Sequence, residues 1–319
     1  MTKPILEVKG LKKHFAAKSG WFQPTEYVQA VNGINLTVHE GETLSIVGES
    51  GCGKSTTGRC LLRLLEPTSG EIWYRGKDLT KLAGKEMRAM RSQLQMVFQD
   101  PFATLNPKLT IRRILEEPLI AQKVPKTRRA ALIEETIHIV GLNPSHLDRY
   151  PHQFSGGQRQ RIGIARALML RPQLIVADEP VSALDVSIQS QILNLLQDLQ
   201  EQFGMTYIFI SHDLGVVEHI SDRVAVMYLG EIVELGSKAE LFQNPLHPYT
   251  KALISAIPIS DPDEQKERII LQGDLPSPAS PPKGCRFHPR CQSCMDICRT
   301  EVPKETYVLG QMVKCHLYS

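Results

Sequence analysis

Short apolar runs alternate with longer amphipathic segments along most of the chain. Residues 5–8 (ILEV) and 34–47 combine apolar and β-branched side chains, while 174–177 (LIVA) and 207–211 (YIFIS) are apolar throughout. These patterns predict strands. The stretch QILNLLQDLQEQFG before the last run has helical spacing, and Gly204 is its expected stop. Apolar strands that alternate with amphipathic helices predict an α/β fold with a parallel sheet covered on both faces.

Two segments depart from this alternation. Residues from about 100 to 170 are polar and helix-rich and lack comparable apolar runs, which predicts an inserted helical subdomain. From residue 256 onward the chain has eight prolines in 64 positions, well above the usual share of about 5%. We therefore expect one domain over residues 1–255 and an irregular extension, rich in proline and cysteine, over 256–319.

The net charge and the hydropathy pattern argue against several classes of protein. Lys and Arg number 37 against 34 Asp and Glu, so the net charge of +3 gives no reason to expect a nucleic-acid partner. No apolar run reaches the 18 or so residues that span a membrane, and the first ten residues lack the pattern of a signal peptide. We expect a soluble cytoplasmic protein.

A glycine-rich loop carries the strongest chemical signal. The segment GESGCGKST matches G-x-x-x-x-G-K-[ST], follows the apolar run 44–47 and precedes a helical stretch. Its backbone N–H groups and the next helix N-terminus form a nest for phosphates. Lys54 can reach the β- and γ-phosphates, and the Ser55 hydroxyl can ligate Mg²⁺. The predicted nucleotide-binding residues here are Gly48, Glu49, Ser50, Gly51, Cys52, Gly53, Lys54, Ser55 and Thr56.

Two acidic residues end the apolar run 174–177. Asp178 stands where a strand end can hold Mg²⁺, and Glu179 could polarise an attacking water. A solvated acidic turn would explain the pair equally well in isolation, but the phosphate-binding loop favours the catalytic interpretation.

The segment FSGGQ opens a predicted helix and forms a second candidate anion site. It contributes Ser155, Gly156, Gly157 and Gln158. A flexible loop is the alternative explanation. Because the chain has one phosphate-binding loop, we interpret the segment as completing the site of a partner subunit.

With these motifs in order, the chain resembles the ATP-binding cassette (ABC) family. VFQDP looks like the Q-loop with Gln99, SALD like the D-loop with Asp185, and FISHD like the switch histidine, His212. Phe15 resembles the aromatic residue that stacks on adenine. FSGGQ looks like the family's signature segment. It has Phe154 where Leu is commoner, an apolar exchange that keeps Ser155 and both glycines.

The resemblance implies a mixed-sheet nucleotide-binding domain with a helical subdomain. It also implies two subunits that enclose two ATP molecules head to tail. Glu179 would be the general base, assisted by His212 and Gln99, with Mg²⁺ held by Ser55, Gln99 and Asp178. Hydrolysis would reopen the dimer and move the membrane subunits through the helical subdomain.

The extension and the residues just before it resemble the oligopeptide and dipeptide importer branch, with nickel and glutathione importers as near relatives. The matching segments are 244–258 (NPLHPYTKALISAIP), 275–278 (LPSP), 284–291 (GCRFHPRC) and 315–317 (CHL). The extension supplies none of the predicted nucleotide ligands, so nucleotide binding is expected to survive its loss.

Five of the seven cysteines crowd into the last 35 residues, which points to a metal in a cytosolic chain. The branch implies a [4Fe–4S] cluster on Cys285, Cys291, Cys298 and Cys315, with Cys294 spare. Local spacing alone favours Cys291, Cys294 and Cys298, and Zn²⁺ is the competing ion.

The resemblance implies an ATPase that powers peptide import. Its partners would be a second, paralogous ATPase subunit, two membrane permease subunits and an extracytoplasmic substrate-binding protein. The chain would then lie peripherally at the cytoplasmic face of the inner membrane. A homodimer, another cargo such as nickel or glutathione, and a soluble ABC ATPase remain open; a small-molecule kinase is discounted because it leaves FSGGQ and His212 unexplained.

Overall fold

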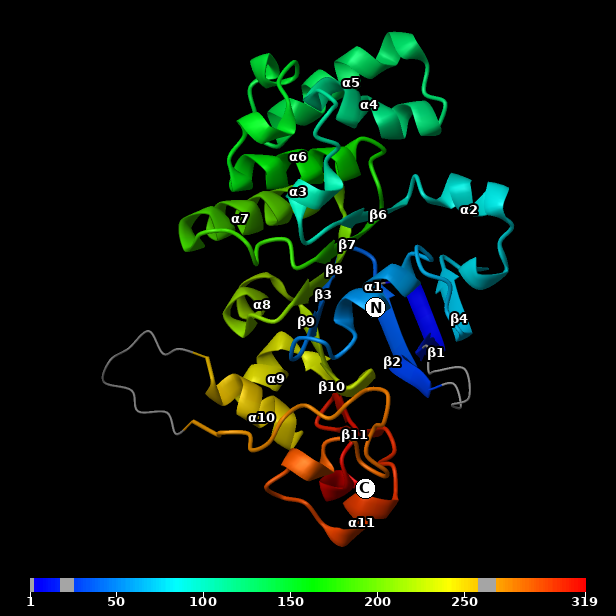
Figure 1. Cartoon of the computed structure of the whole chain (residues 1–319), viewed down its shortest axis with the longest axis vertical. Helices are drawn as coiled ribbons and strands as arrows, with labels where there is room; N and C mark the ends of the chain where they lie inside the picture. Colours follow the sequence, from blue (N-terminus) through cyan, green and yellow to red (C-terminus); the bar gives the residue numbers. More distant parts are fainter. Residues whose placement is uncertain (1–2, 18–25, 258–267) are drawn as a thin grey trace. The chain divides into compact units, whose positions relative to one another are not determined.

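The computed structural model describes residues 3–17, 26–257 and 268–319 (Figure 1). Pro258, the last residue of the segment 244–258, and the following residues through 267 lie outside this part of the chain. The described residues form two compact units: the first falls within Met1–Thr80 and Ile210–Ser319, and the second within Lys81–Phe209. The extension belongs to the first unit, and a domain boundary at residue 255 stays a prediction.

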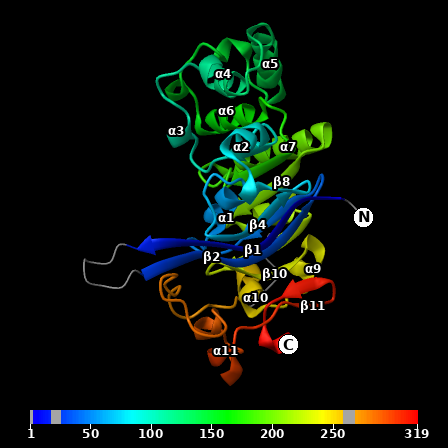
Figure 2. The same ribbon diagram turned by 90° about the vertical axis from the view of Figure 1, so that its right-hand side faces the viewer.

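The first unit contains an antiparallel sheet in the order β2-β1-β4-β5 (Figure 2). Its strands are β1 (Pro4–Ala17), β2 (Glu26–His39), β4 (Ser69–Tyr74) and β5 (Lys77–Asp78). One strand over 34–47 was the wrong prediction, because β2 ends at His39 and β3 starts at Thr43. Gly41 lies between them with φ 78°, and this left-handed conformation turns the chain.

A second group of strands in the first unit surrounds β3. In this unit, β3 pairs parallel with β9, β10 pairs antiparallel with β9, and the hairpin of β11 and β12 adds to β10. The sheet is therefore mixed, as the family resemblance implies, and not wholly parallel. The strands are β3 (Thr43–Val47), β9 (Arg223–Tyr228), β10 (Glu231–Ser237), β11 (Thr306–Val308) and β12 (Gln311–Val313).

The helices of the first unit are short and connect these strands. They are α1 (Lys54–Leu61), α8 (Leu214–Ile220), α9 (Lys238–Gln243), α10 (Pro248–Ser255) and α11 (Asp296–Thr300), with 3₁₀ turns at His288–Arg290 and His316–Tyr318. The 3₁₀ turn Leu79–Lys81 lies at the first junction between the units, and β8 (Thr206–Ser211) lies at the second.

The second unit is mainly helical and also holds two parallel strands, β6 and β7. Its elements are α2 (Gly84–Met90), β6 (Leu94–Val97), α3 (Pro101–Thr104), α4 (Ile111–Ala121), α5 (Lys126–Ile139), 3₁₀ turns at Pro144–His146 and Pro151–Gln153, α6 (Gly156–Leu168), β7 (Leu174–Asp178) and α7 (Val186–Phe203). Gly204 ends α7 with φ 64°, so the predicted stop is confirmed. Within the described residues, no helix is long and apolar enough to cross a membrane.

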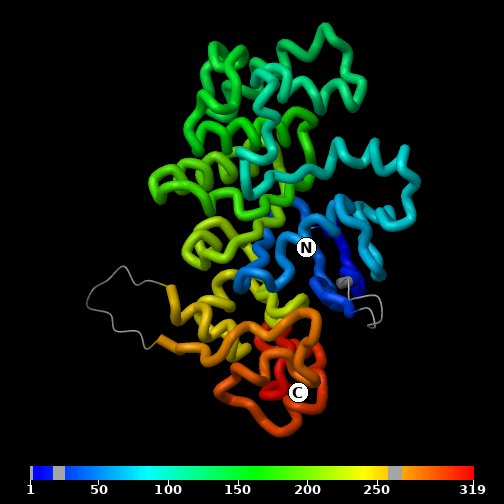
Figure 3. The backbone as a smooth tube through the Cα atoms, in the orientation of Figure 1, coloured from blue at the N-terminus to red at the C-terminus, as the bar shows by residue number. Residues whose placement is uncertain are grey.

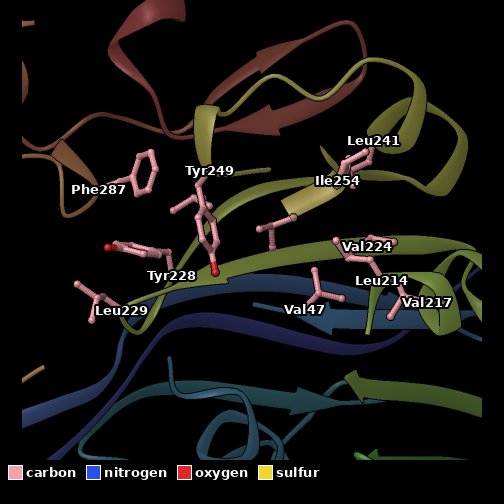
Figure 4. Close-up of a cluster of buried hydrophobic side chains, with 12 residues drawn as sticks. Val47, Leu214, Val217, Val224, Tyr228, Leu229, Leu241, Tyr249, Ile254 and Phe287 are labelled. Carbon is pink, nitrogen blue, oxygen red and sulfur yellow. The ribbon is translucent and has the colours of Figure 1, made fainter. Parts of the chain in front are cut away.

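The extension packs on the core of the first unit through an aromatic cluster (Figure 4). Phe287 is 2% exposed, and its ring centroid lies 5.2 Å from that of Tyr228 on β9 and 5.4 Å from that of Tyr249 on α10. The contact with Tyr228 is edge-on and the contact with Tyr249 is tilted, and such aromatic pairs add to the free energy gained by burial. The tube trace shows how the extension, orange to red, winds beside α10 (Figure 3). Its proline content therefore does not prevent it from sharing a core with the strands.

Candidate nucleotide-binding site

The phosphate-binding loop is shaped by two close backbone contacts. A Cβ atom on Gly48 would lie 2.1 Å from the carbonyl oxygen of Met227, and one on Gly53 would lie 2.0 Å from that of Ala30. Both glycines also have positive φ, 154° and 106°. Any other residue would clash with backbone at both positions, so these glycines are required for the loop to pack here.

The side chain of Lys54 forms hydrogen bonds to the backbone of its own loop. The side chain is 4% exposed, and Nζ donates to the carbonyl oxygens of Gly48 at 2.8 Å and Glu49 at 3.0 Å. A buried ammonium needs such acceptors, and they hold its charge beside the N-terminus of α1. Gly53 is the N-cap of that helix and makes no side-chain hydrogen bond to it, and a helix N-terminus of this kind attracts anions such as phosphate.

Cys52 takes part in the loop through its backbone. Its side chain is 1% exposed, and burial raises the pKa of the thiol, so it stays protonated. Its carbonyl oxygen accepts a hydrogen bond from the Gly230 N–H at 2.9 Å, which ties the loop to the turn between β9 and β10. This thiol therefore has a packing role in the loop.

The acidic pair predicted from LIVADEP lies at the end of β7. Asp178 is the last residue of the strand and is 1% exposed. Glu179 follows with φ 45°, a conformation that residues with a Cβ rarely adopt and that is enriched at active sites. Gln99, which follows β6, donates from Nε2 to Glu179 Oε2 at 2.9 Å. The structure thus joins the predicted Q-loop glutamine to the predicted general base.

The signature segment begins α6. Ser155 is the N-cap: its Oγ accepts from the Gln158 N–H at 3.3 Å, and the Gln158 Oε1 accepts from the Ser155 N–H at 3.1 Å. This capping box holds both side chains at the helix start. Gly157 has a further role that sequence reasoning missed, because its Cβ would lie 2.5 Å from Cγ2 of Ile188 on α7. Close packing of the two helices thus requires a glycine here.

The remaining predicted residues lie near strand and helix ends. In the second unit, Asp185 is the exposed N-cap residue of α7, and the nearby Ser182 Oγ donates to the Glu179 carbonyl oxygen at 3.1 Å. In the first unit, exposed His212 follows β8. Phe15 lies on β1 and is 39% exposed, with Lys13 Nζ 5.1 Å from its ring centroid. That exposure leaves its ring accessible for stacking.

The predicted residues therefore fall into two groups. The loop residues Gly48–Thr56 lie in the first unit with Phe15 and His212. The second unit holds Gln99, Ser155, Gly156, Gly157, Gln158, Asp178, Glu179 and Asp185. The structure brings Gln99 and Glu179 into contact within their unit, as described above.

Two contacts on Glu49 were missed by sequence reasoning. Its N–H donates to Oη of Tyr249 at 2.9 Å, and its carboxylate pairs with the Arg290 guanidinium, Nη1 to Oε2 at 2.7 Å and Nη2 to Oε1 at 3.1 Å. Tyr249 and Arg290 both lie in segments singled out by resemblance, HPYTK and HPRC. Nothing in their spacing connects them to a loop about two hundred residues earlier.

The cysteines of the extension share one neighbourhood. The Cys285 N–H donates to the Cys298 carbonyl oxygen at 2.9 Å. Burial raises the pKa of the Cys285 thiol to about 12, and the nearby thiols of Cys298, Cys315 and Cys291 add to that effect. Thiolates suit iron or zinc, but across the described ranges no three or more His, Cys, Asp or Glu side chains are arranged to hold a metal ion. The predicted [4Fe–4S] cluster stays a prediction.

Comparison with known proteins places this chain in a family. The ABC transporter family matches residues 31–182. The dimeric post-hydrolysis state of the ATP-binding cassette MJ0796, bound to ADP and Pi, has a TM-score of 0.65 and 32% identity, covering 73% of this chain and 98% of that one. This chain belongs to the ABC transporter ATPases.

Its branch follows from the rest of the chain. The family described as oligopeptide/dipeptide transporter, C-terminal region, matches residues 233–298. The chain is 55% identical to the oligopeptide transport ATP-binding protein AppF of Bacillus subtilis, over 99% of this chain and 98% of the relative. It is 50% identical to the dipeptide transport ATP-binding protein DppF of Escherichia coli, over 99% and 95%. The chain is therefore an ABC ATPase of the oligopeptide/dipeptide transporter type.

Proposed function

We propose that this chain hydrolyses ATP to power the uptake of dipeptides or oligopeptides through a membrane permease. The observation that carries the proposal is the match of residues 233–298 to the C-terminal region of such transporters. Relatives named for dipeptide and for oligopeptide transport are similarly close, so the cargo class is short peptides. The chain would act at the cytoplasmic face of the inner membrane, bound to two permease subunits and served by an extracytoplasmic binding protein.

Each residue of the proposed site has its own role in ATP binding or hydrolysis. Lys54 and the loop N–H groups bind the β- and γ-phosphates, and Phe15 stacks on the adenine. Glu179 takes a proton from the attacking water, and its hydrogen bond from Gln99 supports this role by fixing the carboxylate. His212 contacts the γ-phosphate and water. Asp178, Ser55 and Gln99 would hold Mg²⁺, which neutralises charge on the phosphates when it is bound.

We also propose that the signature segment serves the nucleotide of a second subunit. Support comes from the exposed position of Ser155, the capping box that fixes its side chain, and the dimeric state of the structurally similar MJ0796. The proposed partner is a paralogous ATPase. Native mass spectrometry of this chain with Glu179→Gln and ATP tests this choice: dimers that form only after the paralogue is added support it, and homodimers of the chain alone contradict it.

Reconstitution tests the transport function. The chain, its paralogue and both permease subunits are placed in proteoliposomes with the binding protein, and ATP hydrolysis and peptide uptake are measured together. Peptide-loaded binding protein should stimulate both, and the Glu179→Gln complex should show neither. Stimulation by nickel or glutathione with none by peptides would reassign the cargo, and stimulation by nucleic acid would refute transport.

For the extension we propose a [4Fe–4S] cluster on Cys285, Cys291, Cys298 and Cys315. The proposal is supported by the likeness of 284–291 and 315–317 to the importer branch and by the hydrogen bond that joins two of the four positions, from the Cys285 N–H to the Cys298 carbonyl oxygen at 2.9 Å. Iron and sulfide are measured on protein purified without oxygen. Serine at any of the four positions should remove iron, whereas Cys294→Ser is the matched control that keeps it. Zinc at one per chain without sulfide would reject the cluster.

A further inference from the structure

The carboxylate of Glu49 is held by a residue from the far end of the chain. Its bidentate pair with Arg290 joins positions 241 residues apart, and the two side chains are 28% and 9% exposed. Planar guanidinium and carboxylate groups form their strongest and most directional pair in this geometry. The pair therefore fixes the Glu49 side chain far better than a solvent-exposed ion pair would.

Every polar group of Glu49 has a partner within the first unit. The carboxylate binds Arg290, the N–H binds Tyr249 Oη, and the carbonyl oxygen accepts from Lys54 Nζ. Tyr249 is itself packed against Phe287 of the extension. The extension thus reaches Glu49 through the side chain of Arg290 and, independently, through the Phe287–Tyr249 contact to the backbone.

The local structure around Arg290 holds its backbone in place. It ends the 3₁₀ turn His288–Arg290, where its N–H donates to the Phe287 carbonyl oxygen at 3.0 Å. The turn lies between Cys285, which accepts from the His288 N–H at 3.0 Å, and Cys291. Burial of Phe287 anchors the turn, so the guanidinium is presented from a rigid base.

We propose that Arg290 is a positioning residue for the phosphate-binding loop, and that the extension thereby sets the affinity of this site for ATP. The inference rests on the assignment of the loop to ATP. It replaces the expectation from sequence that nucleotide binding is independent of the extension.

The sign of the effect follows from charge. Glu49 is an acidic residue within a loop whose other groups attract phosphates. Paired with Arg290, its negative charge is neutralised and its side chain is held to one side. Without Arg290, the free carboxylate repels the phosphates of ATP and is released to compete for Lys54, so both effects weaken nucleotide binding.

Four versions of the reconstituted transporter test the proposal: wild type, Arg290→Gln, Glu49→Gln and the double variant. Steady-state hydrolysis gives KM and kcat for ATP, and mant-ADP fluorescence gives affinity independently of turnover. Arg290→Gln should raise KM about tenfold with little change in kcat, because the unpaired Glu49 carboxylate weakens nucleotide binding and takes no part in the hydrolysis step. In the Glu49→Gln background, the same change should alter KM less than about twofold. Arg299→Gln, an exposed arginine of the same extension, is the control for charge removal.

The double variant separates positioning from folding. The proposal is overturned if Arg290→Gln leaves KM unchanged. It is also overturned if Arg290→Gln raises KM equally with Glu49 and with Glu49→Gln, because damage to the fold of the extension would not depend on the residue at position 49. If Arg290→Gln does not assemble, Arg290→Lys keeps the charge and loses the bidentate geometry. It should raise KM about threefold only when Glu49 is present, and no rise would overturn the proposal. An inactive wild-type transporter would instead count against the proposed function.

Discussion

The side-chain amide of Gln99 donates a hydrogen bond to the carboxylate of Glu179 across 2.9 Å. The two residues meet because β6 and β7 are parallel and paired, with Val97 opposite Ala177, so their carboxyl ends lie at one edge. Glu179 is the first residue after β7, and Gln99 is the second residue after β6. If Glu179 is the general base, as proposed, this contact holds its carboxylate so that it can act on a water molecule without first reorienting.

Replacing Glu179 with Gln should abolish turnover while ATP binding survives. The variant keeps the shape and the contact to Gln99 but cannot accept a proton, so kcat should fall at least a hundredfold. Single-turnover ATP hydrolysis and nucleotide affinity are the measurements. Glu179→Asp is the control that keeps a carboxylate; hydrolysis near the wild-type rate in Glu179→Gln would contradict the assignment.

Replacing Lys54 with Ala should weaken ATP binding and hydrolysis together. The change removes the buried charge beside the start of α1 and the hydrogen bonds that Nζ donates to the carbonyl oxygens of Gly48 and Glu49. We expect at least a tenfold loss of ATP affinity by equilibrium dialysis. Replacing the exposed Lys77 with Ala is the control and should leave ATP affinity unchanged. Unchanged affinity in Lys54→Ala would refute the proposal that the loop binds the phosphates of ATP.

Gly157→Ala and Gly163→Ala form a matched pair on α6. A Cβ at residue 157 meets Cγ2 of Ile188 at 2.5 Å, and Ile188 is β-branched and rotates with difficulty. A Cβ at residue 163 meets no atom within 4 Å. Gly157→Ala should lower the free energy of unfolding by about 1–3 kcal/mol, and Gly163→Ala should raise it by up to about 1 kcal/mol. Urea denaturation measures both; equal effects would remove the packing explanation.

His247 makes the stability of the fold depend on pH. It is 1% exposed, accepts from the Tyr249 N–H at 3.1 Å through Nδ1, and burial lowers its pKa to about 3 from 6.5. Below pH 6.5 the unfolded chain binds a proton that the folded chain does not, so stability falls as pH falls. Between pH 6.5 and 5 the loss from this group is about 2 kcal/mol.

Urea unfolding at pH 7 and pH 5 tests this dependence. His247→Asn keeps a hydrogen-bond acceptor at the N-cap but does not titrate, so it should lose less stability than wild type between the two pH values. The buried carboxyl of Glu234 next to it has a raised pKa and opposes the trend in both proteins, so their difference isolates His247. Exposed His219→Asn should behave as wild type, and an identical loss in His247→Asn would contradict the prediction.

Local patterns were enough to predict several elements of the fold. An apolar run bounded by Pro172 and acidic residues is a buried strand, and Gly204 ends a helix because glycine tolerates the left-handed conformation. The run 34–47 was misjudged as one strand, because its apolar spacing continues through a turn that depends on the φ angle of Gly41. Hydrophobic periodicity indicates which side chains are buried, but it does not indicate where the chain turns.

The sequence by itself determined the family of the chain and predicted the chemistry of the loop and of the two acidic residues, because a short motif fixes the backbone and side chains that phosphate and water require. Only the tertiary structure decided that Gly157 packs on Ile188 and that Arg290 holds Glu49. The physical reason is distance along the chain: these contacts join segments 31 and 241 residues apart. No periodicity or spacing rule links such segments, and only the packing of the aromatic core around Phe287 brings Arg290 to the loop.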